Sequence, residues 1–387
     1  MPVAIVGVGE LPQGQSSLPN TMVLHEQLAR LALADAGLAL KDVDALLTLS
    51  PRSDAYLIHA TGLAEHLGIR PAVALTLEAG GAAPAAMVDA ARGLIEAGTA
   101  TTVLILAADM PLGGVSRNAY VSNLAEAGPI HPDLERPYGP SVPSMFATVA
   151  RAHMDRYGTN AEHLSAIAMQ NRSAASRHPN AHYREPFNFD AYAKSKLIAD
   201  PLRLLDCAPV SDGGGAIIVT SVERAGESRK SAVNVLGSGF SMGHLHLSAA
   251  PSLTAFAAGD ALDRALKQAK LQRSDIDVAL VYDCFTIAML INVEDLGLAA
   301  KGEAGPAFVA GHFAPSASGE LPINPHGGLL SHGHPARAGG MGNLVEAVMQ
   351  LRDAAGERQI ANTNVAMVHG MGGVFATHGV LLLGRSS

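Results

Sequence analysis

A cluster of histidines and glycines in Asn324-Pro-His-Gly-Gly-Leu-Leu-Ser-His-Gly-His-Pro335 is the part of the chain best suited to chemistry. Its histidines are His326, His332 and His334. Imidazole readily donates, accepts or carries a proton near neutral pH, and glycines let the backbone approach a ligand closely. We therefore predict an active-site loop. The alternatives are a glycine-rich turn whose histidines only bond the backbone, and a metal site, although spacings of six and two without a neighbouring Cys or acid are unusual for zinc.

A second candidate is the tetrad Tyr282-Asp-Cys-Phe285, which follows the apolar run 278–281. Loops at strand ends often carry catalytic residues. A phenol is a good neutral hydrogen-bond donor or general acid, and Cys284 adds a thiol. The alternatives are a core tyrosine and a small buried thiol. The other cysteine, Cys207, is interpreted as a packed loop residue.

Alternating strands and helices must position these segments. The expected strands are 3–8, 43–48, 73–77 and 102–107, and the expected helices are 24–36 and a helix that follows the glycine-rich turn 78–84 and ends near 96. This alternation predicts a layered α/β fold.

An internal repeat supports a duplicated architecture. Residues 36–47 match residues 269–280 at a constant offset of 233, sharing Ala, Leu, the Asp-Val/Ile-Asp pattern and a final Leu. We therefore predict two halves, 1–232 and 233–387, rather than a solenoid. The first half should contain an inserted loop domain at about 112–232, with helices at 144–157 and 161–175.

Composition limits the possible functions. The 387 residues are 48% hydrophobic and 16% charged, which is enough to bury a large core and to form two or more domains. A net charge of -8 without a basic cluster makes nucleic acid an unexpected partner. No apolar run reaches the ~18 residues needed to span a bilayer, and no basic region opens the chain, so a cytoplasmic location is expected by default.

Several motifs together resemble the thiolase superfamily, in its sterol-carrier-protein-2 (lipid-transfer-protein) branch. They are Gly333-His-Pro335 within the histidine loop, Tyr282-Asp-Cys-Phe285, Gly370-Met-Gly-Gly-Val374 and, in the insertion, Met145-Phe-Ala147, Tyr157-Gly-Thr159 and the stretch 201–213. The resemblance covers nearly the whole chain. It implies a thiolase fold of two duplicated halves, five-layered α-β-α-β-α, with an inserted loop domain.

Thiolases combine a nucleophilic cysteine, an acid/base thiol and two oxyanion holes. The resemblance places the nucleophile position at Gly81, in a turn at a helix N-terminus, yet residues 78–84 contain neither cysteine nor serine. An acyl-enzyme at this turn is therefore excluded. The glycine turns, Gly80 and Gly81 in one half and Gly372 and Gly373 in the other, are expected to line the oxyanion holes.

Other family positions carry over individually. His334 matches the histidine that receives a thioester carbonyl. Tyr282 stands where this branch has a histidine, whereas Cys284 keeps the catalytic thiol of the same block. Arg337 replaces a small residue after the Gly-His-Pro motif, and His369 is a weak candidate for the place of a second catalytic cysteine. The expected substrate-binding residues are His332, Asn324, Met145 and His369.

Three functions fit a thiolase fold without its nucleophile. The favoured one is retro-aldol cleavage of a β-hydroxyacyl-CoA thioester, which needs a base and a stabilised enolate but no acyl-enzyme. The alternatives are an acyltransferase that uses Cys284 and a non-catalytic subunit that binds CoA esters. The resemblance implies a homodimer, or a heteromer with a small OB-fold partner that binds acyl-CoA. It implies no metal or bound cofactor, and coenzyme A enters only as the substrate thioester.

Overall fold

The first half of the chain builds a five-stranded sheet in the computed structural model, which describes residues 2–54, 56–113, 130–226, 230–316 and 319–386. Its strands are β1 Val3–Glu10, β2 Ala45–Thr48, β3 Val73–Thr76, β4 Thr102–Asp109 and β7 Gly213–Ser221. The order is β3-β2-β4-β7-β1, with β3, β2 and β4 parallel and β7 antiparallel to its neighbours β4 and β1. The helices are α1 Thr21–Ala36, α2 His59–Leu67 and α3 Ala83–Glu96. The strands and helices predicted here are confirmed, with small shifts at their ends.

The second half repeats this pattern. Its strands are β8 Val233–Met242, β9 Val278–Leu280, β10 Val365–Gly372 and β11 Thr377–Arg385. The order is β8-β11-β10-β9, antiparallel except for the parallel pair β10 and β9. Where the first half has β3, the second half has a single parallel bridge between Ala279 and Ile323. The helices are α9 Ala258–Ala269, α10 Thr286–Asp295, α11 Ala304–Ala310, α12 Gly328–Ser331 and α13 Gly340–Leu351.

Local structure confirms the repeat at an offset of 233 residues. In each copy the helix ends at a residue with positive φ, Gly37 at 75° and Lys270 at 57°. The carboxylate of Asp44 then accepts hydrogen bonds from two backbone N–H groups at the start of β4. Asp277 does the same at the start of β10. The shared aspartates are therefore explained by a shared corner between strands.

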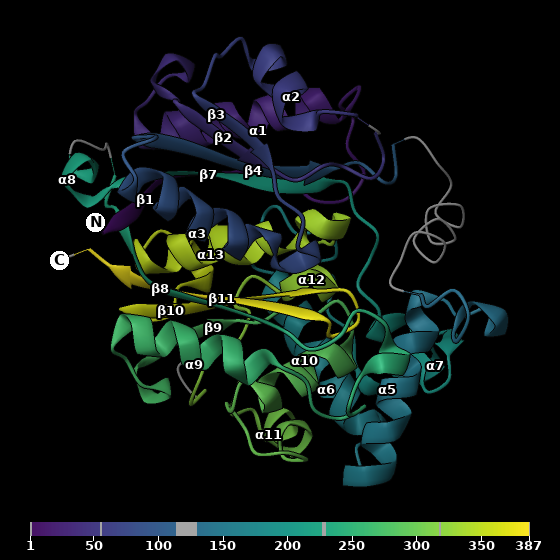
Figure 1. Cartoon of the computed structure of the whole chain (residues 1–387). Coiled ribbons are helices and arrows are strands. Elements are labelled where there is room, and N and C mark those ends of the chain that lie inside the picture. The colour runs from purple at the N-terminus through teal and green to yellow at the C-terminus, as the bar shows by residue number, and fades with distance from the viewer. Residues whose placement is uncertain (1, 55, 114–129, 227–229, 317–318, 387) are drawn as a thin grey trace.

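Five layers stack in Figure 1, in the order α-β-α-β-α. Helices α1 and α2 cover the outer face of the first sheet, α3 and α13 lie between the sheets, and α9 to α11 cover the second sheet. Strands β1 and β8 join the two sheets through the pairs Ala4–Asn234 and Ile5–Val233. Because the strands are covered on both faces, they read as continuous apolar runs, and Val103 to Ala107 are wholly buried. The predicted fold class is confirmed.

The insertion lies beside the second sheet and carries α5 Val142–Tyr157, α6 Ala161–Ala175 and α7 Phe189–Lys194. Two short strands follow, β5 Leu197–Ala199 and β6 Leu202–Arg203, and the chain leaves β7 through α8 Val222–Ala225. The two predicted helices are confirmed. The predicted end of the insertion at 232 was wrong, because β7 is a central strand of the first sheet. The division of the chain after residue 232 stays a prediction, and β8 begins at Val233.

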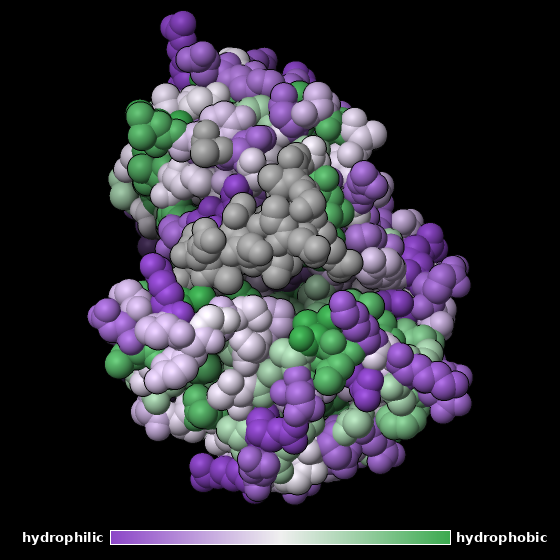
Figure 2. Space-filling view, turned by 90° about the vertical axis from the view of Figure 1, so that its right-hand side faces the viewer, coloured by the Kyte–Doolittle hydropathy of each residue, from purple (hydrophilic) through white to green (hydrophobic). Residues whose placement is uncertain are grey.

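The surface offers no single apolar face in the view of Figure 2, where apolar residues gather in separate patches among polar ones. Among the helices that the structure describes, none has the length and apolar character that crossing a bilayer would require.

Candidate active site

Tyr282 and His334 meet at the carboxyl end of β9. Tyr282 comes two residues after this strand, and His334 lies near the end of the predicted histidine loop. Tyr282 Oη and His334 Nε2 are 3.1 Å apart, and the rings meet edge-on with centroids 6.0 Å apart. The structure thus brings two predicted site residues together as a hydrogen-bonded pair that can share one proton.

The backbone of His334 is fixed by Ser211. The His334 N–H donates to Ser211 Oγ at 3.1 Å, and the Ser211 N–H donates to the His334 carbonyl at 3.4 Å. Loss of water around the ring lowers the pKa of His334 to about 4. The imidazole is therefore neutral at pH 7. The residue as a whole is half-buried.

Gly81 lies against the ring of Tyr282. A Cβ atom added at Gly81 would sit 2.4 Å from Tyr282 Cε2 and 2.4 Å from the carbonyl oxygen of Met371. Both distances are far shorter than any ordinary carbon contact. In this conformation the position that the resemblance assigns to the nucleophile is therefore closed to a side chain, and the Tyr282 ring occupies the space beside it.

The glycine turns of the two halves pack backbone against backbone at the same place. Gly80 has φ of 57°, and a Cβ on it would be 2.7 Å from Gly372 Cα. A Cβ on Gly372 would be 2.4 Å from the carbonyl oxygen of Ala79, and Gly373 has φ of 64°. The predicted glycine turns are thus neighbours of Tyr282, and their role in holding an oxyanion stays a prediction.

Three buried side chains hold the backbone that carries Tyr282 beyond the end of β9. The amide of Asn324 pairs with Val281, accepting from its N–H and donating to its carbonyl, both at 2.8 Å. The Tyr282 N–H donates to His369 Nδ1 at 3.4 Å, and its carbonyl accepts from Asn292 Nδ2 at 2.9 Å. Asn324 and His369 are fully buried and hold this backbone, and their expected contact with substrate stays a prediction.

Asp283 holds the histidine loop through hydrogen bonds to its backbone. Its carboxylate accepts from the backbone N–H groups of Leu329 at 2.7 Å and Leu330 at 3.3 Å, in the first turn of α12, and from Asn171 Nδ2 at 2.6 Å. Burial raises the pKa of Asp283 to about 7. The role of Asp283 was missed from the sequence, where the available signal was an acid between two candidate residues, Tyr282 and Cys284.

The thiols lie in less reactive surroundings. Cys284 is only 9% exposed, and burial raises the pKa of its thiol well above the usual range. Met145, an expected substrate contact, is 4% exposed and belongs to the same apolar cluster as Cys284. Cys207 is half-buried, and its Sγ donates to the Arg203 carbonyl at 3.3 Å. A neutral, buried Cys284 is a weak nucleophile.

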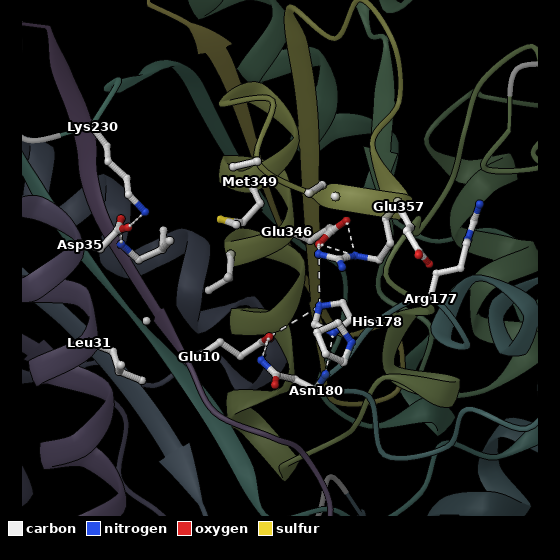
Figure 3. Close-up of a pocket in the computed structure, with 18 of the residues that line it drawn as sticks. Glu10, Leu31, Asp35, Arg177, His178, Asn180, Lys230, Glu346, Met349 and Glu357 are labelled. Carbon is white, nitrogen blue, oxygen red and sulfur yellow. Dashed lines mark hydrogen bonds and ion pairs between the residues drawn. The ribbon is translucent and has the colours of Figure 1, made fainter.

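His332 belongs to a separate polar cluster. Its Nε2 lies 3.1 Å from Glu10 Oε1, and His178 Nε2 lies 3.6 Å from Glu10 Oε2. Figure 3 shows Glu10 and His178 in the wall of a cavity of about 890 Å³, whose lining includes neither Tyr282 nor His334. Since His332 is 2% exposed and contacts this cluster, its expected contact with substrate is not supported by its position.

In the described part of the chain, this cluster has the arrangement of donor atoms that could hold a metal ion. The donor atoms of Glu10, His178 and His332 lie within 4.8 Å of one another. However, His178 Nδ1 accepts from the Asn180 backbone N–H at 3.1 Å. A histidine that binds a metal through Nε2 carries its proton on Nδ1 and donates it. With Nδ1 accepting, the proton of a neutral His178 lies on Nε2, toward Glu10, which does not fit metal ligation through that nitrogen.

Arg337 ties the histidine loop to the glycine turn. Its guanidinium forms an ion pair with Glu78 and donates to the Ser50 carbonyl at 2.7 Å. Glu78 also accepts from the Gly80 N–H at 3.0 Å. The arginine that departs from the family pattern therefore pairs with a carboxylate of its own chain.

Comparison with known proteins adds a family and several relatives. Residues 239–385 match the family model described as Thiolase C-terminal domain-like. The chain is 32% identical to an acetyl-CoA acetyltransferase of Methanothermobacter thermautotrophicus over 99% of both chains. It is 31% identical to the 17-hydroxy-3-oxo-4-pregnene-20-carboxyl-CoA lyase of Mycobacterium tuberculosis, over 90% of this chain and 91% of the lyase.

Two further similarities concern lipid-transfer proteins and a solved complex. The chain is 30% identical to sterol carrier protein 2 of Gallus gallus over 73% of its length, which is 53% of that longer protein. A solved structure, the Ltp2-ChsH2(DUF35) aldolase, superposes with a TM-score of 0.86 at 28% identity, covering 99% of this chain and 98% of the other.

Proposed function

This chain belongs to the thiolase superfamily, in its sterol-carrier-protein-2-like branch, and on that premise we propose that it cleaves β-hydroxyacyl-CoA thioesters by a retro-aldol reaction. The observation that carries the proposal is the Tyr282 ring packed on Gly81 and bonded to His334. It supports a site with a shared proton but no room for a nucleophile. The lyase relative and the aldolase neighbour favour the same reaction class.

The paired side chains suit such a reaction because it removes one proton from the substrate and later returns one to it. The Tyr282–His334 pair takes the proton of the β-hydroxyl, and the Cα–Cβ bond breaks. The β-carbon leaves as a ketone or aldehyde, and the bonding electrons form an enolate on the thioester. Donors beside the glycine turns hold the enolate oxygen, and the pair returns the proton to Cα. Atoms and charge balance without an oxidant or a cofactor.

The acyltransferase alternative finds support in the acetyltransferase relative. It would require Cys284 to ionise, and burial raises the pKa of that thiol. We also propose that the enzyme works with a small acyl-CoA-binding partner, since the aldolase neighbour consists of two proteins. A non-catalytic CoA-ester-binding subunit is the remaining alternative, and turnover distinguishes it from both enzymes.

A homodimer is the second part of the proposal. Strand β3 ends its sheet in the described part of the chain, so one edge of its backbone is open to pairing. Its Leu75 is 49% exposed, and Leu57 and Ile58, directly before α2, are 100% and 64% exposed. Pairing of this edge with a second copy would cover the strand.

Substitution of Tyr282 by phenylalanine tests the reaction. The ring keeps its packing on Gly81, whereas the hydroxyl that contacts His334 is lost. Retro-aldol turnover should fall about 10²-fold or more, which is typical of a lost general acid or oxyanion donor. Tyr138→Phe is the matched control, because Tyr138 is 86% exposed. Free-CoA-dependent cleavage of a β-ketoacyl-CoA that survives Tyr282→Phe would reject the proposal in favour of a thiolase.

A further inference from the structure

We propose that His378 is a positioning residue for Tyr282, and that it acts by fixing the tautomer of His369. The inference takes the role of Tyr282 from the proposed function, but the hydrogen-bond chain behind Tyr282 stands on its own geometry. His378 lies on β11, outside the motifs that resemble the thiolase family, and is fully buried.

Four groups form one hydrogen-bond chain whose two ends are fixed. The Tyr282 N–H contacts His369 Nδ1 at 3.4 Å, His369 Nε2 contacts His378 Nδ1 at 3.1 Å, and His378 Nε2 contacts the Phe375 carbonyl at 3.2 Å. A backbone N–H can only donate, and a carbonyl can only accept. The His378 proton must therefore be on Nε2, which leaves His378 Nδ1 as an acceptor for a proton on His369 Nε2.

This assignment leaves a lone pair on His369 Nδ1 that faces the Tyr282 N–H. If His369 carried its proton on Nδ1 instead, two N–H groups would point at each other and would push the Tyr282 backbone away. The two ring planes differ by only 17° and their centroids are 5.4 Å apart, so the rings lie edge to edge, as a hydrogen bond between their nitrogens requires. Burial also lowers the pKa of His378 to about 4 and that of His369 well below its usual range, so both rings remain neutral.

The chain also joins two walls of the site. Phe375 follows the glycine turn at Gly372 and Gly373 and has a positive φ of 55°. Its carbonyl orients His378, and the far end of the chain orients Tyr282. Two neutral imidazoles, His369 and His378, thus connect the backbone of Tyr282 to the glycine turn.

Two substitutions at His378 separate this role from packing. In His378→Asn the Oδ1 atom takes the place of Nδ1 and can accept from His369, whereas His378→Leu offers no acceptor. We expect His378→Leu to lower kcat about 10-fold or more with little change in KM, because small displacements of a catalytic group are costly. His378→Asn should recover most of that loss. Thermal unfolding of both variants checks that each is folded.

Nuclear magnetic resonance of ¹⁵N-histidine-labelled full-length protein reads the tautomer without any substrate. His369 should carry its proton on Nε2 in wild type and His378→Asn, and should lose that preference in His378→Leu. An unchanged His369 tautomer in His378→Leu would overturn the inference. So would equal kcat values for His378→Leu and wild type.

A second pair of variants covers a His378→Leu protein that does not fold. In the His369→Asn background the group facing Tyr282 has no tautomer to choose, so adding His378→Leu should change kcat by less than about twofold. A large further loss would contradict the proposed coupling. If wild type shows no retro-aldol turnover, the proposed function fails, and the tautomer measurement still decides the inference.

Discussion

Substitution of Gly81 by alanine challenges the packing that closes the nucleophile position. The added Cβ would lie 2.4 Å from Tyr282 Cε2, 2.5 Å from Cζ and 2.4 Å from the Met371 carbonyl oxygen, where ordinary contact begins at 3.4 Å. The backbone of Gly81 does not have positive φ, so this contact is the whole penalty. The Tyr282 ring and the backbone around the Met371 carbonyl must therefore each move away from the new Cβ, by about 1 Å.

Such a displacement should be felt in both stability and rate. A shift of about 1 Å would stretch the Tyr282–His334 contact, now 3.1 Å, beyond hydrogen-bond range. Overpacking typically lowers the free energy of unfolding by about 1–3 kcal/mol. A displaced catalytic group typically costs about 10²-fold in rate. We therefore expect Gly81→Ala to fold, with reduced stability, and to lose most retro-aldol activity.

Gly93→Ala is the matched control, because Gly93 lies inside α3 with no heavy atom within 4 Å of an added Cβ. It should raise the free energy of unfolding by about 0.5–1 kcal/mol. Urea denaturation and single-turnover rates on a β-hydroxyacyl-CoA would be measured for both variants. Wild-type stability and rate in Gly81→Ala would refute the packing argument. Thiolase activity in Gly81→Cys, with Tyr282 unchanged, would also refute it.

Three further results are expected. Because burial lowers the pKa of His334 to about 4, its contribution to stability is complete above about pH 6.5 and should be lost progressively as pH falls from about 6.5 to 4. A profile of kcat against pH should accordingly lack a His334-dependent acid limb near 6.5, and finding one that disappears in His334→Asn would contradict this. Intact-mass measurement during turnover should show both Cys207 and Cys284 unmodified, whereas a substrate adduct on Cys284 would favour the acyltransferase. Leu75→Glu should yield monomers in light scattering and Leu197→Glu, also 49% exposed, should not; dimers in both would place the interface elsewhere.

The elements of the fold could be predicted because their signals are local. An apolar run such as Val103 to Ala107 indicates a buried strand wherever it occurs, and the repeated Asp-Val/Ile-Asp pattern reports a corner that is closed within each half. The end of the insertion was misplaced because β7 returns to the first sheet after about a hundred residues. Nothing in the composition of β7 indicates that it pairs with β1 and β4.

The site was predicted in its residues more than in its contacts. Tyr282 and His334 were found from their types and motifs, but the contact of Tyr282 with Gly81 joins positions 201 residues apart in sequence. Asn324 and His369 were expected to bind substrate because they lie in the two histidine- and glycine-containing motifs that resemble the thiolase family. In the structure both side chains contact backbone groups just beyond the end of β9, and His369 also contacts His378, contacts that become apparent only when the chain is folded.

The amide of Asn324 has a mechanical consequence for the two central side chains. Asn324 opens the loop that ends with His334, and its two bonds to Val281 attach that loop to the residue before Tyr282. Thermal motion of the loop should therefore carry both side chains in the same direction, with little change in their separation. Such motion would change the width of the substrate's path to the site, whereas the distance between Tyr282 Oη and His334 Nε2 would stay nearly constant.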